Sequence, residues 1–175
     1  GGLQKISLIN YPGMICAVIF TQGCNFRCPY CHNPELVNPD LFSTCLLIED
    51  VLLFLEKRRG KLDAVTITGG EPTIQNDLIT FIQEIKTRDY LVKIDTNGSH
   101  PDMLRRLIEA KLIDYIAMDI KGPLDKYPEI IGRNFDFDQI LKSIKLIMKT
   151  NTPYEFRTTV TKSLLKPSDV LRIGD

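Results

Sequence analysis

Ala64-Val65-Thr66-Ile67-Thr68-Gly69-Gly70-Glu71-Pro72 is the stretch of sequence that decides the fold. Its first five residues are mostly apolar or β-branched, which is typical of a strand buried in a sheet. A glycine-rich turn follows, and apolar residues then recur at helical spacing from Leu78 to Ile85. A buried strand followed by an amphipathic helix predicts βαβ units, and therefore a parallel sheet with helices packed on it.

The same alternation of strand and helix occurs five times along the chain. Strands are predicted at 15–20, 64–68, 90–94, 114–118 and 154–160, and helices at 47–55, 78–85, 101–108 and 140–147. A fifth helix, capped by Ser168 and Asp169, has just begun where the sequence ends. A complete eight-unit barrel typically needs about 250 residues, so 175 residues predict an incomplete barrel or an open parallel sheet.

The charge balance narrows the class of protein. Lys and Arg number 22, and Asp and Glu also number 22, so the formal net charge is zero. A non-specific nucleic-acid binder would carry a clear basic excess, so we expect no nucleic-acid partner. No apolar run approaches the roughly 20 residues of a membrane span, and no signal peptide is recognisable. We therefore expect a cytoplasmic protein without a membrane partner.

Cysteines supply the strongest chemical signal. Cys24, Cys28 and Cys31 lie within eight residues, in the spacing Cx3CxxC. Three thiolates in one loop would hold an iron–sulfur cluster with one iron open to a small molecule. The alternative is a structural zinc site with His32 as fourth ligand, although adjacent residues 31 and 32 fit poorly on one tetrahedron. Cys16 is expected in the core, and Cys45 near a helix start.

Polar and glycine-rich residues follow each predicted strand. The carboxyl ends of parallel strands share one edge of a sheet, where βα loops form active sites. Taken singly, Asp95-Thr96-Asn97-Gly98 would be an ordinary turn, and Asp119 with Lys121 a surface ion pair. Together with the cysteines they indicate one site. The candidates at this edge are Gly69, Gly70, Glu71, Asp95, Asn97, Asp119, Lys121 and Arg157.

The stretch Cys24-Asn25-Phe26-Arg27-Cys28-Pro29-Tyr30-Cys31 resembles the cluster loop of the radical S-adenosylmethionine (SAM) superfamily, and Gly69-Gly70-Glu71-Pro72 resembles its second hallmark. Within the superfamily, residues 20–36, Asp95-Thr96-Asn97-Gly98 and Asp119-Ile120-Lys121 are most similar to the glycyl-radical-enzyme activases. Among these, the resemblance is greatest to the activating protein of anaerobic ribonucleoside-triphosphate reductase. It implies one radical SAM core domain over residues 1–175, of the incomplete (β/α)6 TIM-barrel type, with outer helices. The sixth strand expected of this core is missing from the sequence, which leaves two alternatives open, a C-terminally truncated fragment and a natural short form.

The resemblance also implies roles for the matched residues. Cys24, Cys28 and Cys31 would bind a [4Fe-4S] cluster, whose fourth iron is chelated by SAM. Tyr30 and His32 would lie beside the adenosine. The implied contacts at the strand ends are Gly69, Gly70 and Asn97 near SAM, Glu71 on its ammonium, Lys121 or Arg157 on its carboxylate, and Asp119 on its ribose. Asp95, Thr96 and Asp119 are candidates for holding a monovalent cation.

The implied reaction is reductive cleavage of SAM to methionine and a 5′-deoxyadenosyl radical. That radical would take a Cα hydrogen from a glycine of a partner enzyme, expected to be anaerobic ribonucleotide reductase. Flavodoxin or ferredoxin would donate the electron, and no side chain is expected to act as an acid or base. Two alternatives stay open: a radical SAM enzyme acting on a small molecule, as deazaguanine synthases do, and a non-catalytic iron–sulfur or zinc module.

Overall fold

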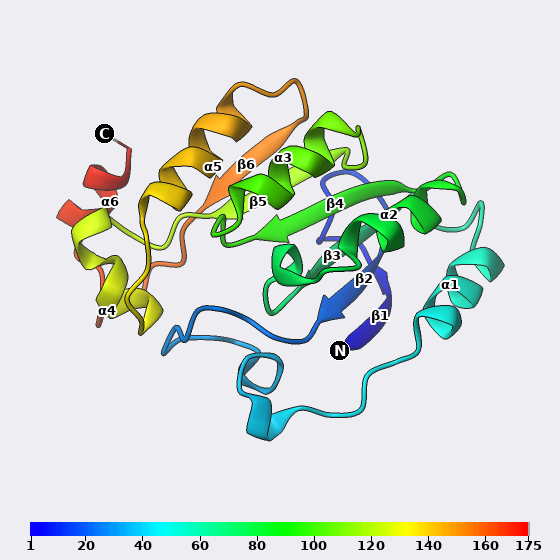
Figure 1. Ribbon diagram of the computed structural model, residues 1–175, viewed down its shortest axis with the longest axis horizontal. Coiled ribbons are helices and arrows are strands. Elements are labelled where there is room, and N and C mark those ends of the chain that lie inside the picture. The colour runs from blue at the N-terminus through cyan, green and yellow to red at the C-terminus, as the bar shows by residue number, and fades with distance from the viewer. Residues whose placement is uncertain (175) are drawn as a thin grey trace.

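A computed structural model describes residues 1–174 and contains one six-stranded sheet, with the strand order β1-β2-β3-β4-β5-β6 (Figure 1). β1 pairs antiparallel with β2, and every later pair of neighbours is parallel. The five predicted parallel strands are therefore confirmed. The strands are β1 (Gly2–Ser7), β2 (Cys16–Thr21), β3 (Ala64–Gly69), β4 (Leu91–Thr96), β5 (Tyr115–Asp119) and β6 (Tyr154–Arg157).

Helices follow the parallel strands as predicted. Each βαβ crossover advances one strand in the same direction, so right-handed connections place the helices on the same face of the sheet. This is the arrangement of a partial barrel, and within residues 1–174 the sheet does not close on itself. The helices are α1 (Ile48–Lys57), α2 (Leu78–Lys86), α3 (Pro101–Glu109), α4 (Tyr127–Ile131), α5 (Asp138–Met148) and α6 (Pro167–Ile173).

Four local features differ from the sequence-based expectation. The last strand is predicted over 154–160, but β6 ends at Arg157. β1 is not predicted, because its exposed residues outnumber its buried ones and no alternation marks it. The short helix α4 is also missed, since it has only five residues and little periodicity. α6 starts at Pro167 with Lys166 as N-cap, so Ser168 and Asp169 lie in its first turn. Asp169 still helps to cap the helix, because its carboxylate accepts from the Lys166 amide at 2.8 Å. Proline fits a first helical position because its fixed φ is already helical.

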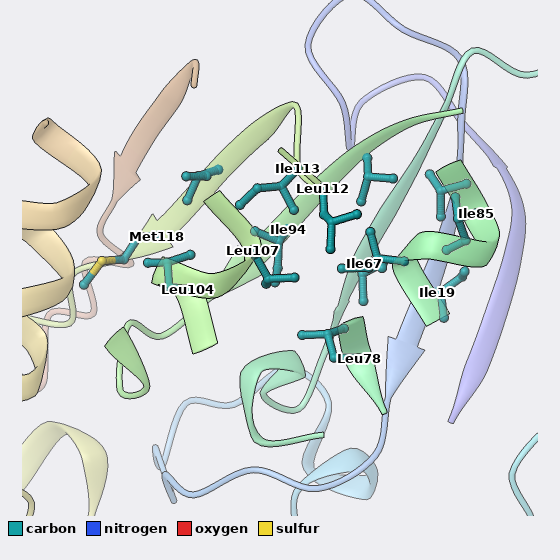
Figure 2. Packing of buried hydrophobic residues seen from close by; sticks show 14 of the residues in the cluster. Ile19, Ile67, Leu78, Ile85, Ile94, Leu104, Leu107, Leu112, Ile113 and Met118 are labelled. Atoms are coloured by element: carbon teal, nitrogen blue, oxygen red, sulfur yellow. The ribbon is translucent and has the colours of Figure 1, made fainter. Parts of the chain in front are cut away.

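The main core lies between the sheet and the helices, and Figure 2 shows its packing. Val65 and Ile67 of β3 point to this side, as do Val92 and Ile94 of β4, because alternate residues of a strand share a face. They pack against apolar side chains of four helices. These helical residues are Val51 and Leu55 of α1, Leu78, Ile82 and Ile85 of α2, Leu104 and Leu107 of α3, and Ile140 and Ile147 of α5.

The opposite face of the sheet carries the other set of alternate residues. At the amino ends of the parallel strands, Tyr11 packs on Cys16, Val18 and Ala64. Its ring lies 5.8 Å from that of Tyr115, so the segment between β1 and β2 covers this end of the face. Cys16 is fully buried there, as expected for a core thiol.

Polar residues gather at the other end of this face, where the parallel strands finish. Lys93 and Asp95 of β4 are both buried, and β5 and β6 add Asp119 and Arg157 directly opposite each other. The fold therefore concentrates charge at the carboxyl edge of the sheet. Within residues 1–174, none of the helices combines the length and apolar character needed to cross a bilayer.

Candidate functional site

A cavity of about 200 Å³ lies at the carboxyl edge of the sheet. The cysteine loop forms one wall, and the ends of β3, β4, β5 and β6 form the other. Every site residue expected from the sequence lines this cavity. These residues are Cys24, Cys28, Tyr30, Cys31, His32, Gly69, Gly70, Glu71, Asp95, Asn97, Asp119, Lys121 and Arg157.

The cysteine loop leaves β2 and is fastened at several points. The Gly23 amide donates to the Leu36 carbonyl at 2.8 Å, which closes the loop at its base. The Arg27 guanidinium donates to the Cys24 carbonyl at 2.6 Å, and the Arg27 amide donates to the Ile131 carbonyl at the end of α4 at 2.8 Å. These hydrogen bonds to backbone carbonyls hold the loop in place without a metal.

All three loop cysteines are free and half-buried. Burial raises the pKa of Cys24 to about 11, although the Phe26 amide, 3.4 Å from its Sγ, acts in the opposite direction. Burial also raises the pKa of Cys28, opposed by the positive charge of Lys121. Metal binding would supply the compensation that a buried thiolate needs. Within residues 1–174, no three His, Cys, Asp or Glu side chains form a site for a single metal ion.

The glycine pair after β3 is required by the protein's own backbone. Gly69 has φ +115°, and a Cβ there would lie 2.4 Å from the Thr21 backbone. A Cβ on Gly70 would lie 1.9 Å from the Gly23 carbonyl oxygen. The Glu71 amide donates to that same oxygen at 2.8 Å. The glycines therefore let the end of β3 pack directly against the start of the cysteine loop.

Glu71 joins the ends of β3 and β4. It is 1% exposed, and its Oε1 accepts from the Thr73 amide at 3.0 Å and from the Thr96 hydroxyl at 2.7 Å. Oε2 accepts from the Asn97 amide at 2.6 Å. Burial raises the pKa of this carboxyl, and the hydrogen bonds from Thr73, Asn97 and Thr96 oppose that shift. Oε2 keeps acceptor capacity toward the cavity, so binding of the SAM ammonium stays a prediction that the geometry permits.

The Asn97 side chain connects β4 to the cysteine loop. Its Nδ2 donates to Asn25 Oδ1 at 3.0 Å and reaches the Cys24 sulfur at 3.9 Å. Asn97 is 6% exposed and lies deep in the cavity wall. It therefore belongs to the immediate surroundings of the thiols.

A row of alternating charges crosses β4, β5 and β6. Lys93 pairs with Asp95, and Arg157 Nη1 lies 3.6 Å from Asp95 Oδ2. Arg157 Nε lies 3.1 Å from Asp119 Oδ1, and Lys121 Nζ lies 2.9 Å from Asp119 Oδ2. Burial alone would raise the pKa of Asp119, but the charges of Lys121 and Arg157 outweigh it and hold the pKa below its ordinary value.

The three residues expected to hold a monovalent cation already have partners within the protein. Asp95 and Asp119 contact basic side chains, and the Thr96 hydroxyl donates to Glu71. A cation would have to share these carboxylates with Arg157. The cation therefore stays a prediction.

Tyr30 and His32 lie on the cysteine-loop side of the cavity. The Tyr30 hydroxyl is buried and has no hydrogen-bond partner among residues 1–174, and burial raises its pKa to about 12. An orphaned buried hydroxyl is costly, so a bound polar ligand would stabilise it. Half-buried free thiols, a partnerless hydroxyl and charged groups around one cavity fit a cluster with a zwitterionic nucleoside cofactor. His32 is exposed at the rim.

Sequence reasoning missed some contributors to the site. Lys93 is 2% exposed and is the buried partner of Asp95, which makes it the main omission. Its position two residues before Asp95 in a strand indicated a shared face, and that signal was available. Phe26 and Val37 also line the cavity, but no spacing in the sequence marks them. Thr159 lines it too, and its alternate spacing with Glu155 and Arg157 indicates a shared face. Cys45 is exposed and does not line it; its Sγ lies 2.9 Å from Gln22 Oε1.

Residues 18–164 match the radical SAM superfamily. The chain is 38% identical over 174 residues to a protein of Methanocaldococcus jannaschii named as a glycyl-radical enzyme activating enzyme, covering 97% of this chain and 71% of that protein. It is 32% identical over 152 residues to the pyruvate formate-lyase-activating enzyme of Clostridium pasteurianum, covering 83% of this chain and 62% of that enzyme. The chain thus spans less than two thirds of this second relative.

A solved structure shares the fold. The crystal structure of Streptococcus suis SuiB bound to S-adenosylmethionine superimposes with a TM-score of 0.71 at 18% identity. The match covers 90% of this chain and 36% of SuiB. At this level of identity the comparison concerns the fold alone, and it supports the partial barrel described above.

Proposed function

Because this chain belongs to the radical SAM superfamily, whose members use a [4Fe-4S] cluster and SAM, we propose that it activates a glycyl radical enzyme. The partner we propose is anaerobic ribonucleotide reductase, and the electron donor is a flavodoxin or ferredoxin. The observation that carries the proposal is the single cavity that unites three free cysteines with the ends of β3 to β6. Similarity to activating enzymes over nearly the whole chain supports the activase assignment.

In this proposal, Cys24, Cys28 and Cys31 hold the cluster. When bound, the cluster and SAM supply one-electron cleavage of a sulfonium and abstraction of a hydrogen atom. Lys121 or Arg157 would pair with the carboxylate of SAM, and Arg is suited to a bidentate grip. The remaining contacts are Glu71 on the ammonium, Gly69, Gly70 and Asn97 around the methionine portion, Asp119 on the ribose, and Tyr30 and His32 beside the adenosine.

The rim of the cavity suits a target on a protein loop. His32 and Thr159 are exposed and both line the cavity, so its mouth lies between the cysteine loop and the end of β6. A glycine on a projecting loop can enter such a mouth, because it has no side chain to clash with the walls. The buried polar residues on the inner wall are tied to one another by hydrogen bonds, such as those from Thr96 and Asn97 to Glu71, which favours a fixed orientation of the bound cofactor.

Cleavage of SAM is the first test. The protein is reconstituted anaerobically with iron and sulfide, and 5′-deoxyadenosine is measured after addition of SAM and dithionite. We expect product from the wild type and from Cys45→Ser, whose thiol lies outside the cavity. Cys28→Ser should give only background. Equal product from wild type and Cys28→Ser would contradict the enzymatic proposal.

The partner is tested separately. The loaded protein, SAM and reductant are mixed with the candidate reductase, and a glycyl radical is sought by electron paramagnetic resonance. We expect a radical doublet that is absent when the reductase or SAM is omitted. Efficient SAM cleavage without this signal would exclude the reductase as partner. Consumption of a small-molecule substrate would then favour the deazaguanine-synthase-like alternative.

A further inference from the structure

The Asn97 side chain reaches a sulfur of the cysteine loop. Its Nδ2 lies 3.9 Å from Cys24 Sγ. We propose that Asn97 is a positioning residue that raises the reduction potential of the iron–sulfur cluster by donating an N–H to the Cys24 sulfur. The inference rests on the proposed function only in that Cys24 must be a cluster ligand.

The orientation of the Asn97 amide follows from its other contacts. Oδ1 accepts the Ser99 amide at 2.9 Å, and a backbone N–H can only donate. The NH₂ group must therefore face the cysteine loop. One of its two protons is directed to Asn25 Oδ1 at 3.0 Å, which leaves the other for the Cys24 sulfur.

The backbone that carries Asn97 is fixed on several sides. The Asn97 amide donates to Glu71 Oε2 at 2.6 Å. The Gly98 amide donates to the Thr96 hydroxyl at 3.1 Å, and the Gly98 carbonyl accepts from Ser143 of α5 at 2.7 Å. These contacts prevent the side chain from simply turning away when the sulfur becomes charged, so the donor is preorganised.

A hydrogen bond to a ligand sulfur favours the cluster state that carries more negative charge. Reduction adds an electron, so such donors raise the reduction potential. Cys24 already receives the Phe26 amide at 3.4 Å, and Asn97 would be a second donor on the same sulfur. Reductive SAM cleavage needs the reduced cluster, which gives this donor a functional consequence.

The test measures the potential and not the activity. Wild type, Asn97→Ala and Asn97→Asp are reconstituted, and cluster reduction is followed in a potentiometric titration without SAM. We expect Asn97→Ala to lower the equilibrium constant for reduction about tenfold, which is about 59 mV for a one-electron couple. Asn97→Asp should lower it further, because it places a negative charge beside the sulfur.

Ser143→Ala is the matched control. It removes a hydrogen bond from the same loop, but Ser143 contacts the Gly98 carbonyl and no sulfur. Its potential should equal that of the wild type. Unchanged potentials in both loaded Asn97 variants, or an equal shift in Ser143→Ala, would overturn the inference.

The outcomes separate this inference from the proposed function. If the cluster assembles and its potential shifts in the Asn97 variants, but the wild type cleaves no SAM, the inference is sustained and the proposed enzymatic function is refuted. If the wild type cleaves SAM but the Asn97 variants leave the cluster potential unchanged, the proposed function is sustained and this inference is refuted. Failure of the wild type to assemble any cluster would overturn both. If both Asn97 variants lose the cluster while Ser143→Ala keeps it, the donor is structural and the tuning role is rejected.

Discussion

Arg157 Nε donates to Asp119 Oδ1 at 3.1 Å, between residues that stand directly opposite each other on β6 and β5. The same guanidinium reaches Asp95 of β4 at 3.6 Å. One side chain therefore ties the ends of three neighbouring strands together at the wall of the cavity. Lys93 and Lys121 each neutralise one of these carboxylates, and Arg157 is the cation that contacts both Asp95 and Asp119.

Replacing Arg157 by Met should shift the acid limit of stability. The pKa of Asp119 is held below its ordinary value by Lys121 and Arg157. A carboxyl with a lowered pKa in the folded state stabilises the protein above its unfolded-state pKa, and this contribution is lost as pH falls through the folded-state value. Without Arg157 the folded-state pKa rises, so part of the contribution disappears already at neutral pH.

The measurement is urea unfolding of wild type and Arg157→Met at pH 7, 4 and 3. We expect the difference in unfolding free energy to be largest at pH 7 and to shrink toward pH 3, because the pKa of Asp119 in the folded wild type lies below its ordinary value. Arg157→Lys keeps a charge but cannot bridge both carboxylates. Its unfolding free energy should therefore lie between those of the wild type and Arg157→Met. A difference independent of pH would show that Arg157 acts through packing.

Lys93 should contribute to the stability of the fold only when its carboxylate partner Asp95 is present. Lys93 is 2% exposed and pairs with Asp95, and its Nζ lies 6.0 Å from the Tyr115 ring centroid. Removing Lys93 leaves the buried Asp95 carboxylate with only the more distant Arg157 guanidinium at 3.6 Å, so Lys93→Met should cost about 3 kcal/mol in unfolding free energy. The double variant with Asp95→Asn should recover much of that loss.

A double-mutant cycle in urea checks this coupling between Lys93 and Asp95. Lys86→Met is the control, because Lys86 is the partly exposed partner of Asp114 and the loss of a more exposed ion pair should cost less. Additive effects of Lys93→Met and Asp95→Asn would contradict the paired role.

Gly70→Ala should destabilise the fold itself. Its Cβ would lie 1.9 Å from the Gly23 carbonyl oxygen, which is backbone and cannot rotate away. Overpacking typically costs about 1–3 kcal/mol, and a backbone clash of this size belongs at the upper end. Thermal unfolding measures the loss. Gly2→Ala is the control, because its nearest neighbour would be the Phe20 side chain at 3.9 Å. Equal melting temperatures for the two variants would contradict the assignment.

Glu71→Gln should weaken the junction of β3 and β4 more than its small change in shape suggests. The carboxylate accepts from Thr73, Thr96 and Asn97, and an amide nitrogen in place of either oxygen would face the backbone amide of Thr73 or Asn97, which can only donate. Hydrogen bonds to a charged group contribute about 1.5–3 kcal/mol each, so we expect a loss of about 2 kcal/mol or more. Unfolding in urea measures it, with Thr73→Val as the comparison that removes a single side-chain donor. A loss of unfolding free energy no greater than that of Thr73→Val would contradict the conclusion that Glu71 joins the ends of β3 and β4.

The pattern of apolar residues was sufficient for the architecture. Ala64 to Thr68 and the amphipathic repeat after it predict a βαβ unit, because burial on both faces of a strand and one face of a helix leaves a strong periodic signal. β1 was not predicted, because a half-exposed edge strand leaves little pattern of apolar residues in the sequence. The short α4 was not predicted, because its five residues do not complete two helical turns and therefore show no helical periodicity.

The sequence by itself determined which residues carry chemistry: three cysteines at close spacing and polar residues after each parallel strand. The tertiary structure alone decided how they are joined. Asn97 reaches Cys24 across 73 residues of chain, and Arg157 reaches Asp119 across 38. Such contacts depend on strand order and register, which set side-chain distances that local sequence does not encode. The buried Lys93 is different, because its partner Asp95 lies two residues away on the same strand, and the tertiary structure decided only that the pair is buried.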